Sequence, residues 1–414
     1  MAEIFEIKEQ EERIILVGVA VSDGDDTKES LEELEELGKT AGAVTVGKVI
    51  QNRENIHPGT YIGKGKIDEV RELVEELDAT GVVCDDELSP VQLKNLQEAL
   101  DVKVIDRTIM ILDIFASRAS TKEGKIQVEL AQLKDRASRL VGLRNSLSRL
   151  GGGIGTRGPG EKKLEMDRRL IKERITQLNR ELNDVKRSRE TTRQQRSKNG
   201  IPVIAIVGYT NAGKSTLLNT LTGAGVLEED KLFATLDPTT RNLTLESGQQ
   251  ILLTDTVGFI RKLPHHLVDA FRSTLEEAKY ADIILHVVDS SNPDAYKQMH
   301  VVYETLNKLG VKDKTIITAF NKQDKLEVPL IIKDFKADKV VKISGKQKTG
   351  LDTLLEVIED ILKEQKILIE KVFSYSDAGK IQGIRKYGQL LEEEYREEGI
   401  FVKAYVPKEI YPTL

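Results

Sequence analysis

The feature that most constrains the fold is a glycine-rich loop between an apolar strand and a helix. The apolar run Val203–Val207 precedes the loop, and a helical pattern begins at Thr216. The loop reads Gly208, Tyr209, Thr210, Asn211, Ala212, Gly213, Lys214, Ser215. This is G-x4-G-K-S in the strand-loop-helix context of a phosphate-binding loop, whose backbone N–H groups and helix N-terminus face the phosphates. It predicts an α/β domain with a nucleotide site.

Three further motifs follow in order. They are Asp255-Thr256-Val257-Gly258, Asn321-Lys322-Gln323-Asp324 and Ser344-Gly345-Lys346. Asp324 can accept hydrogen bonds from guanine N1–H and the 2-amino group. Adenine offers neither donor and would leave the carboxylate unpaired. Four motifs in this order predict a GTP-binding and GTP-hydrolysing enzyme.

The same motifs predict roles for single side chains. We expect Lys214 to reach the β- and γ-phosphates and Ser215 to ligate Mg²⁺ through its hydroxyl. Asp255 supplies a carboxylate toward the Mg²⁺, and Gly258 supplies an N–H for the γ-phosphate. Asn321 would hold the base and its loop together, and the Lys322 stem would cover one base face. Thr216 and the Ser344 to Lys346 loop complete the expected nucleotide contacts.

The catalytic side is unusual, because Phe259 follows Gly258 where many GTPases carry a water-positioning Gln. Phenylalanine cannot orient or polarise water, so we expect slow intrinsic hydrolysis that needs outside help. Asn211 resembles the residue at this loop position in GTPases that bind K⁺. Our hypothesis is that K⁺ neutralises developing charge there, with Lys214 and Asn211 as the catalytic candidates.

Charge is distributed unevenly along the chain. The net charge is -6, yet residues 134–198 contain 19 Lys or Arg and 8 Asp or Glu. That segment therefore carries +11, and the remainder carries -17. A strongly basic segment within an acidic chain predicts a polyanionic partner.

The basic segment has the pattern of two helices. One apolar seam at 4,3 spacing runs from Ile126 to Leu147, and a second runs from Ile171 to Val185. Between them, residues 151–160 contain six glycines and a proline, which cannot continue a helix. We predict an antiparallel helical hairpin with a loop at its tip. The alternative, a coiled-coil spacer, explains the seam but not the loop length or the charge.

Periodicity places the basic hairpin (residues 119–199) between α/β segments. Strands are expected at 14–21, 43–50, 81–85 and 102–105, with helices at 27–37, 67–77 and 90–100, the first stopping at Gly38. The predicted fold class is α/β: an N-terminal α/β domain over residues 1–118, the hairpin with its tip loop at 151–160, a P-loop GTPase domain over 200–365 and a small α+β domain over 366–414.

Together these features resemble the HflX family of translational GTPases, over essentially the whole chain. The resemblance is carried by the loop Gly208-Tyr209-Thr210-Asn211, by the glycine-rich segment 151–160 with Glu161-Lys162-Lys163-Leu164-Glu165, and by Phe233-Ala234-Thr235-Leu236-Asp237-Pro238-Thr239-Thr240-Arg241. The residues alone leave Thr235, Thr239 and Thr240 open as the switch threonine. The resemblance implies that Thr235 ligates Mg²⁺ and that Phe233, Ala234, Leu236 and Asp237 lie at the nucleotide.

The resemblance also implies a target. It implies binding to the 50S subunit through rRNA and splitting of 70S or 100S ribosomes under stress. The residues expected at the rRNA are Arg149, Gly151, Gly152, Gly153, Arg157, Gly158, Lys162 and Lys163. A second function, an rRNA-binding GTPase in large-subunit assembly, uses the same residues. An RNA-independent signalling GTPase would leave the basic hairpin unexplained.

Other features suggest location and regulation. One cysteine, Cys84, fits a reducing cytoplasm, where we expect a ribosome-associated monomer. No run of about 18 apolar residues occurs, so we expect no stable membrane insertion, whereas peripheral membrane association stays open. The segment 61–66 is either a helix-entry turn or a minimal phosphate loop for ATP. The acidic helix 27–37 could fold onto the basic hairpin as self-inhibition.

Overall fold

The computed structural model describes most of the chain, which divides into two compact units. Described are residues 11–21, 26–150, 159–198, 201–223, 232–233, 235–264, 267, 272–327, 333–364, 366–407 and 411, the side chains of 141–150, 159–164, 192–198, 272–275, 378, 386–387 and 407 excepted. The first unit comprises Met1–Asn183, Glu229–Leu236 and Arg261–Arg272, and the second comprises Asp184–Glu228, Asp237–Ile260 and Ser273–Leu414. Two short segments after the phosphate loop thus belong with the N-terminal part of the chain.

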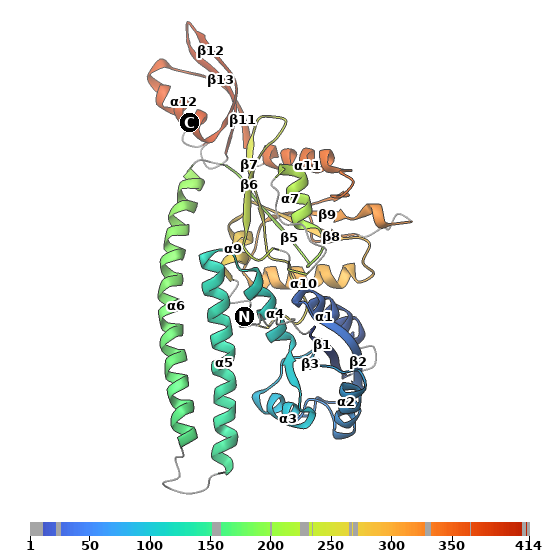
Figure 1. The fold of residues 1–414 in the computed structure, drawn as a ribbon. Coiled ribbons are helices and arrows are strands. Elements are labelled where there is room, and N and C mark those ends of the chain that lie inside the picture. Colours follow the sequence, from blue (N-terminus) through green and yellow to red (C-terminus); the bar gives the residue numbers. More distant parts are fainter. Residues whose placement is uncertain are drawn as a thin grey trace, which may run out of the picture. The chain divides into compact units, whose positions relative to one another are not determined.

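The first unit contains a four-stranded parallel sheet (Figure 1). Its strands are β1 (Arg13–Ala20), β2 (Val44–Asn52), β3 (Gly81–Cys84) and β4 (Lys103–Asp106). They are ordered β2-β1-β3-β4, and each neighbouring pair is parallel. The apolar run of β1 is buried because a parallel sheet is covered by helices on both faces.

Four helices cover this sheet. They are α1 (Thr27–Ala41), α2 (Lys64–Glu76), α3 (Pro90–Leu100) and α4 (Arg107–Arg118). Ile15, Val17 and Val19 of β1 pack in one apolar cluster with α2 and α3, whereas a Cβ on Gly18 would lie 2.7 Å from Thr27 of α1. Helices α1 and α4 also contact one another. The helices that follow β1 and β3 therefore lie on opposite faces of the sheet.

One helix end and one additional helix correct the sequence-based expectation. Helix α1 continues past Gly38 and ends at Gly42, which has φ +90°. A Cβ on Gly38 would lie 3.0 Å from Ile14, so this glycine allows close packing on β1 and does not stop the helix. Helix α4 was not predicted. It follows β4 without a loop, and Asp106 caps it by accepting the Ile109 N–H at 3.0 Å.

The hairpin consists of two long antiparallel helices, α5 (Lys122–Leu150) and α6 (Pro159–Lys198), which lie side by side (Figure 1). The predicted seam is present, and its members in contact are Ile126, Leu130, Leu133, Ile175, Leu178 and Leu182. An ion pair at 2.8 Å between Arg174 and Glu129 joins the helices beside the seam.

The second unit contains a six-stranded sheet ordered β10-β9-β8-β5-β7-β6. Its strands are β5 (Val203–Gly208), β6 (Thr239–Thr244), β7 (Gln250–Asp255), β8 (Ile283–Asp289), β9 (Thr315–Asn321) and β10 (Lys339–Lys342). Its helices are α7 (Lys214–Thr222), α9 (Arg272–Tyr280), α10 (Ala295–Lys308) and α11 (Leu351–Glu364), with a 3-10 turn η1 (Gln323–Lys325). Every strand pair is parallel except β6 with β7. The loops after β5, β7, β9 and β10 therefore meet at one edge, where ligands bind in such sheets.

The chain ends in a small antiparallel sheet ordered β11-β13-β12. Its elements are β11 (Lys366–Phe373), η2 (Tyr375–Asp377), α12 (Ala378–Tyr387), β12 (Gln389–Arg396) and β13 (Gly399–Pro407). Strand β12 was not predicted. It is a charged edge strand with mostly exposed or half-buried side chains, so it lacks the apolar alternation of a buried strand.

None of the helices within the described ranges has an apolar stretch that could cross a bilayer.

Candidate nucleotide-binding site

The phosphate loop has a backbone that only its two outer glycines permit. A Cβ on Gly208 would lie 2.3 Å from the Val287 carbonyl oxygen of β8. Gly213 has φ +93°, and a Cβ there would lie 2.3 Å from Asn321 Nδ2. Helix α7 begins at the next residue, Lys214. The spacing G-x4-G-K therefore reflects two close backbone approaches as well as room for phosphates.

Lys214 is buried at the start of α7, with an exposed fraction of 6%. Its Nζ donates to the Tyr209 carbonyl oxygen at 2.9 Å. Burial lowers the pKa of Lys214 to about 8, with Asp255 opposing the shift and Lys322 adding to it. This ammonium is thus poised to gain an anionic partner, because a phosphate would restore its charged state.

Ser215 and Asp255 bring two oxygens together beside this lysine. The Ser215 hydroxyl donates to Asp255 Oδ2 at 2.7 Å, and Asp255 is fully buried at the end of β7. Hydroxyl and carboxylate oxygens are the ligands that Mg²⁺ prefers. The residues present therefore fit the metal that the sequence predicted.

The segment after β7 pairs with the phosphate loop through Phe259. The Phe259 N–H donates to the Gly208 carbonyl at 3.1 Å, and the Thr210 N–H donates to the Phe259 carbonyl at 2.8 Å. Thr256 anchors the same segment by donating its hydroxyl to the Ile206 carbonyl at 2.8 Å. Sequence reasoning treated Phe259 only as a missing Gln. Its ring is buried and its backbone holds the D-x-x-G segment in place.

Asn321 connects three of the four motifs. Its Nδ2 donates to the Ala212 carbonyl at 2.9 Å, and its Oδ1 accepts the Gly345 N–H at 2.9 Å. The next loop is tied in as well, because the Ser344 hydroxyl donates to Asp324 Oδ1 at 2.5 Å. The side chains expected at the guanine base thus converge on the phosphate loop.

Asp289 at the end of β8 is a site residue that sequence reasoning missed. Its Oδ2 lies 2.7 Å from Lys322 Nζ, which also donates to the Asn211 carbonyl at 2.7 Å. Lys322 has φ +61°, so these contacts hold an uncommon backbone conformation. The available signal was an acid at the carboxyl end of the apolar run Ile283–Asp289, the pattern already used for Asp255.

The remaining predicted site residues lie in different elements and in both units. Thr239 and Thr240 lie in β6, where the Thr240 hydroxyl is 2.9 Å from that of Thr254, and Thr235 precedes the strand. Phe233, Thr235 and Leu236 belong to the first unit, and Asp237 to the second. Thr216 lies in the first turn of α7, Val257 is buried, and Lys346 is exposed.

Most residues predicted to contact rRNA lie outside the described part of the chain. This holds for Gly151, Gly152, Gly153, Arg157 and Gly158, and likewise for Ala234 in the switch segment. Arg149, Lys162 and Lys163 belong to α5 and α6, but their side chains are not described.

A phosphate loop after a central parallel strand, with a guanine-reading loop at the same edge, defines the class of P-loop GTPases. Family models match along the chain: GTP-binding GTPase N-terminal over residues 28–116, GTP-binding GTPase Middle Region over 118–196 and 50S ribosome-binding GTPase over 203–322.

Curated relatives identify the family. GTPase HflX of Lacrimispora saccharolytica is 69% identical over 100% of this chain and 98% of its own length. GTPase HflX of Caldanaerobacter subterraneus subsp. tengcongensis is 52% identical over 99% of this chain and 94% of its own length. The chain belongs to the HflX family of GTPases. A solved structure of SsGBP in complex with GDP is 28% identical and covers 84% of this chain and 98% of that one, with a TM-score of 0.48.

The protein is therefore a GTP hydrolase that binds GTP and GDP.

Proposed function

We propose that this GTPase binds the large ribosomal subunit and splits idle or stalled 70S or 100S ribosomes, with GTP binding and hydrolysis as the switch. The observation that carries the proposal is one chain that combines a guanine-nucleotide site with a long, basic helical hairpin. The family model over residues 203–322 is described as 50S ribosome-binding GTPase, which supports this target.

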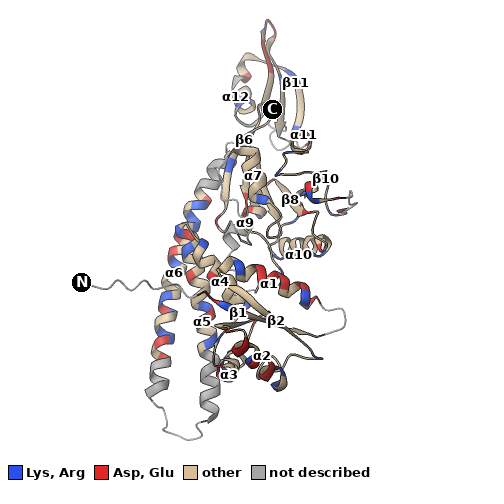
Figure 2. Ribbon diagram, turned by 45° about the vertical axis from the view of Figure 1, so that its right-hand side comes forward, with Lys and Arg blue, Asp and Glu red and all other residues tan. Residues whose placement is uncertain are grey.

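The position of the charge supports rRNA as the partner. Residues 165–191 of α6 carry eight basic and six acidic side chains, and both signs occur along this helix in Figure 2. Residues 141–164 at the hairpin tip carry five basic residues and one acidic. Phosphate backbones dominate the affinity of proteins for nucleic acids. We therefore assign the rRNA contact to the tip, to Arg149, Arg157, Lys162, Lys163 and the glycines between them.

Apolar side chains beside the tip support a macromolecular contact. Met166 and Leu170 of α6 are 65% and 58% exposed, although large apolar side chains gain stability from burial. They lie four residues apart and so share one helix face. A basic tip with an adjacent apolar face suits a folded ribonucleoprotein surface better than a free polyanion.

The chain's own residues would handle the nucleotide as follows. Lys214 binds the β- and γ-phosphates, Asp324 reads the guanine edge, and Asn321 keeps the two loops in register. Ser215 and Thr235 would hold Mg²⁺, which when bound neutralises phosphate charge. Asn211, at φ +58° beside the Lys322 contact, is the residue through which K⁺ would act.

The test is GTP hydrolysis in K⁺ buffer by the full chain, alone and with 70S ribosomes, 50S subunits or protein-free rRNA. Sedimentation on the same mixtures uses a non-hydrolysable GTP analogue. Strong stimulation by 50S and 70S, with 70S separating into subunits, supports ribosome splitting. Stimulation by bare rRNA with intact 70S favours the alternative, an rRNA-binding GTPase in large-subunit assembly.

A matched pair of variants tests the hairpin tip. Arg157→Glu with Lys162→Glu reverses two charges at the tip, and should abolish ribosome stimulation while leaving the basal rate unchanged. Arg169→Glu with Arg187→Glu reverses two charges of α6 whose side chains are each 81% exposed. Equal losses in both pairs would show that net charge, and not the tip, governs binding.

A further inference from the structure

The carboxyl edge of the N-terminal sheet carries an acidic site at a position where this fold binds ligands. Asp85 and Asp86 directly follow β3. The helices that follow the neighbouring strands β1 and β3 lie on opposite faces of the sheet, and folds of this kind bind ligands at the edge between two such strands. Asp85 is fully buried, although ionised carboxylates are rarely buried without partners.

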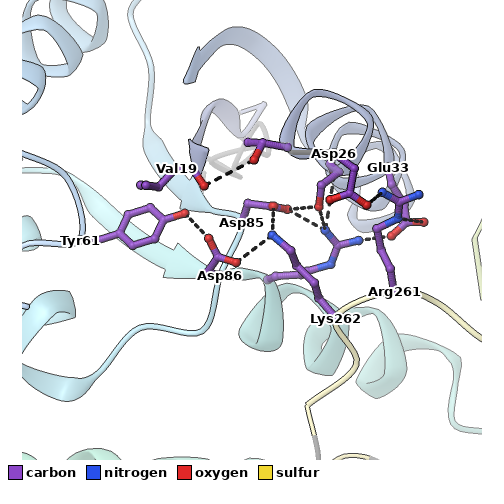
Figure 3. Close-up of polar contacts among 11 residues, drawn as sticks. Val19, Asp26, Glu33, Tyr61, Asp85, Asp86, Arg261 and Lys262 are labelled. Carbon is purple, nitrogen blue, oxygen red and sulfur yellow. Dashed lines mark hydrogen bonds and ion pairs between the residues drawn. The ribbon is translucent and has the colours of Figure 1, made fainter. Parts of the chain in front are cut away.

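The partner at this edge is a lysine from the segment after D-x-x-G. Lys262 Nζ lies 2.5 Å from Asp85 Oδ2 and 2.7 Å from Asp86 Oδ1 (Figure 3). The Asp85–Lys262 contact joins residues 177 positions apart within the first unit. Burial alone would lower the pKa of Lys262, but attraction to the two carboxylates raises it. The lysine is therefore bound as a cation.

Residues other than Lys262 also orient the two carboxylates. Asp85 Oδ1 accepts from Arg107 at 2.6 Å and from the Ser30 hydroxyl at 3.0 Å. Asp86 Oδ2 accepts from the Tyr61 hydroxyl at 2.6 Å, as Figure 3 shows. Each carboxylate thus leaves its other oxygen facing Lys262. Such preorganisation favours a specific partner over a diffuse attraction.

Arg261 adds a second attachment. Its guanidinium lies 2.9 Å from Asp26 Oδ2 and 3.7 Å from Glu33 Oε2, and Glu33 also pairs with Arg107. Glu33 of the acidic helix α1 therefore pairs with Arg107 and Arg261. The self-inhibition hypothesis had expected the basic partners of this helix on the hairpin. Without the attached segment, Arg107 and the four carboxylates have a net formal charge of -3. Arg261 and Lys262 reduce this net charge to -1. The four carboxylates are those of Asp26, Glu33, Asp85 and Asp86.

The attached segment has an uncommon backbone conformation. Lys262 has φ +52°, which L side chains rarely adopt. An outlier of this kind persists only where its surroundings impose it, and it points to a functional contact. Here it occurs at the residue whose side chain makes the two ion pairs with Asp85 and Asp86.

The attachment bears on the nucleotide because Arg261 lies three residues after Gly258. A Cβ on Gly258 would lie 3.0 Å from Lys214 Nζ and 2.9 Å from the Thr210 Cα. Gly258 therefore lies close against both the phosphate loop and the lysine expected at the γ-phosphate. A γ-phosphate placed between Gly258 and the Lys214 ammonium would require this spacing to widen.

The first switch segment is attached to the same unit. Phe233 packs edge-on against Phe115 of α4, with ring centroids 4.6 Å apart and an interplanar angle of 74°. Phe233 is 2% exposed and has φ +56°. Both segments that respond to the γ-phosphate in P-loop GTPases thus contact the N-terminal unit.

We propose that Asp85 and Asp86 form a docking site for Lys262 that holds the D-x-x-G segment against the phosphate loop and so favours GDP over GTP. GTP binding pulls Gly258 away from Lys214 and loosens the Lys262 contact. Conversely, loss of the contact favours GTP, because coupling between two sites is reciprocal. The proposal rests on the GTPase site alone and does not depend on a ribosomal partner.

The test compares two nucleotides on the full chain. Lys262→Gln and Asp86→Asn each remove one charge of the contact, and Asn keeps the size of Asp86. Affinities for GDP and a non-hydrolysable GTP analogue are measured by fluorescence titration. We expect the ratio of GTP-analogue affinity to GDP affinity to rise about tenfold in both variants, within the usual range of allosteric coupling. The basal hydrolysis rate should rise with it.

Two controls make the result specific. Lys39→Gln removes an exposed lysine of the same unit that pairs with Glu35 and Glu36, and should leave the ratio unchanged. Lys262→Arg keeps the positive charge that faces Asp85 and Asp86 and should leave the ratio close to that of the unaltered protein. An unchanged ratio in Lys262→Gln and Asp86→Asn, or a shift toward GDP, would overturn the proposal. Thermal unfolding of each variant shows whether the unit is intact.

Discussion

The two larger sheets of this protein, parallel except for β6, each gather loops at a carboxyl edge, but the two edges present different groups. In the second unit, the edge presents backbone N–H groups, the start of α7 and Lys214, an arrangement for an anion. In the first unit, the corresponding edge presents Asp85 and Asp86, and it holds the cation Lys262. The fold thus determines where a ligand lies, whereas the loop residues determine which ligand it is.

The acidic edge depends on one buried cation, and removing it should give the largest effect. Arg107 has a side chain that is 2% exposed and pairs with Asp85 and Glu33. Arg107→Met should lower the free energy of unfolding by about 3–5 kcal/mol, since the carboxylates lose their buried partner. Urea denaturation measures it. Lys103→Met, which removes an exposed pair with Glu12, should cost no more than about 1 kcal/mol.

We expect the loop that contains Asp324 to make the nucleotide site specific for guanine. Asp324→Asn should weaken GTP binding about 100-fold, because an amide cannot accept both guanine donors. Xanthosine triphosphate should gain affinity in the same variant, since its 2-oxo group accepts from the new amide. Competition titration with the two nucleotides measures both changes. Retained guanine preference would mean that Asp324 does not contact the base.

The K⁺ hypothesis concerns the same carboxyl edge of the second unit's sheet. If K⁺ acts through Asn211, hydrolysis should be about 100-fold faster in KCl than in NaCl, the lower end of typical losses on removing one charge-stabilising group. Asn211→Ala should remove the difference while nucleotide affinity is retained. Equal rates of the unaltered protein in the two salts would eliminate the hypothesis.

The depressed pKa of Lys214 predicts a pH dependence of nucleotide binding. The free protein loses the Lys214 proton as pH rises through about 8, while bound phosphates keep the lysine charged. GDP affinity should therefore fall about fourfold between pH 7 and pH 8.5, with proton uptake on binding. Calorimetry in two buffers of different ionisation enthalpy detects that uptake. A constant affinity with no proton uptake would contradict it.

The smallest expected effect is that of replacing Gly345, in contrast to Gly208, whose missing side chain is required for nucleotide binding. A Cβ on Gly345 would meet nothing closer than Asn321 Oδ1 at 3.6 Å, an ordinary contact. Gly345→Ala should leave GDP affinity unchanged and raise the free energy of unfolding by about 0.4–1 kcal/mol. Gly208→Ala, where the Cβ would lie 2.3 Å from the Val287 carbonyl, should abolish GDP binding. Thermal unfolding with and without GDP distinguishes them.

The sequence by itself determined the nucleotide site and the hairpin seam. Each phosphate- or base-reading motif is local, and parallel strands bring such loops to one edge whatever else the chain does. The features that the sequence did not predict also have physical reasons. Gly38 seemed to end a helix because close packing on Ile14 cannot be read locally. Strand β12 was missed because a charged edge strand has no apolar alternation.

Only the tertiary structure decided how the two edges are used. Asp289 becomes a site residue because β8 lies beside β9, and Phe259 becomes the backbone partner of the phosphate loop because β7 lies beside β5. Lys262 and Asp85 are 177 positions apart, and no spacing or periodicity connects them. A short motif encodes its own backbone, whereas the pairing of distant charges follows from the strand order and from the cost of burying a carboxylate alone.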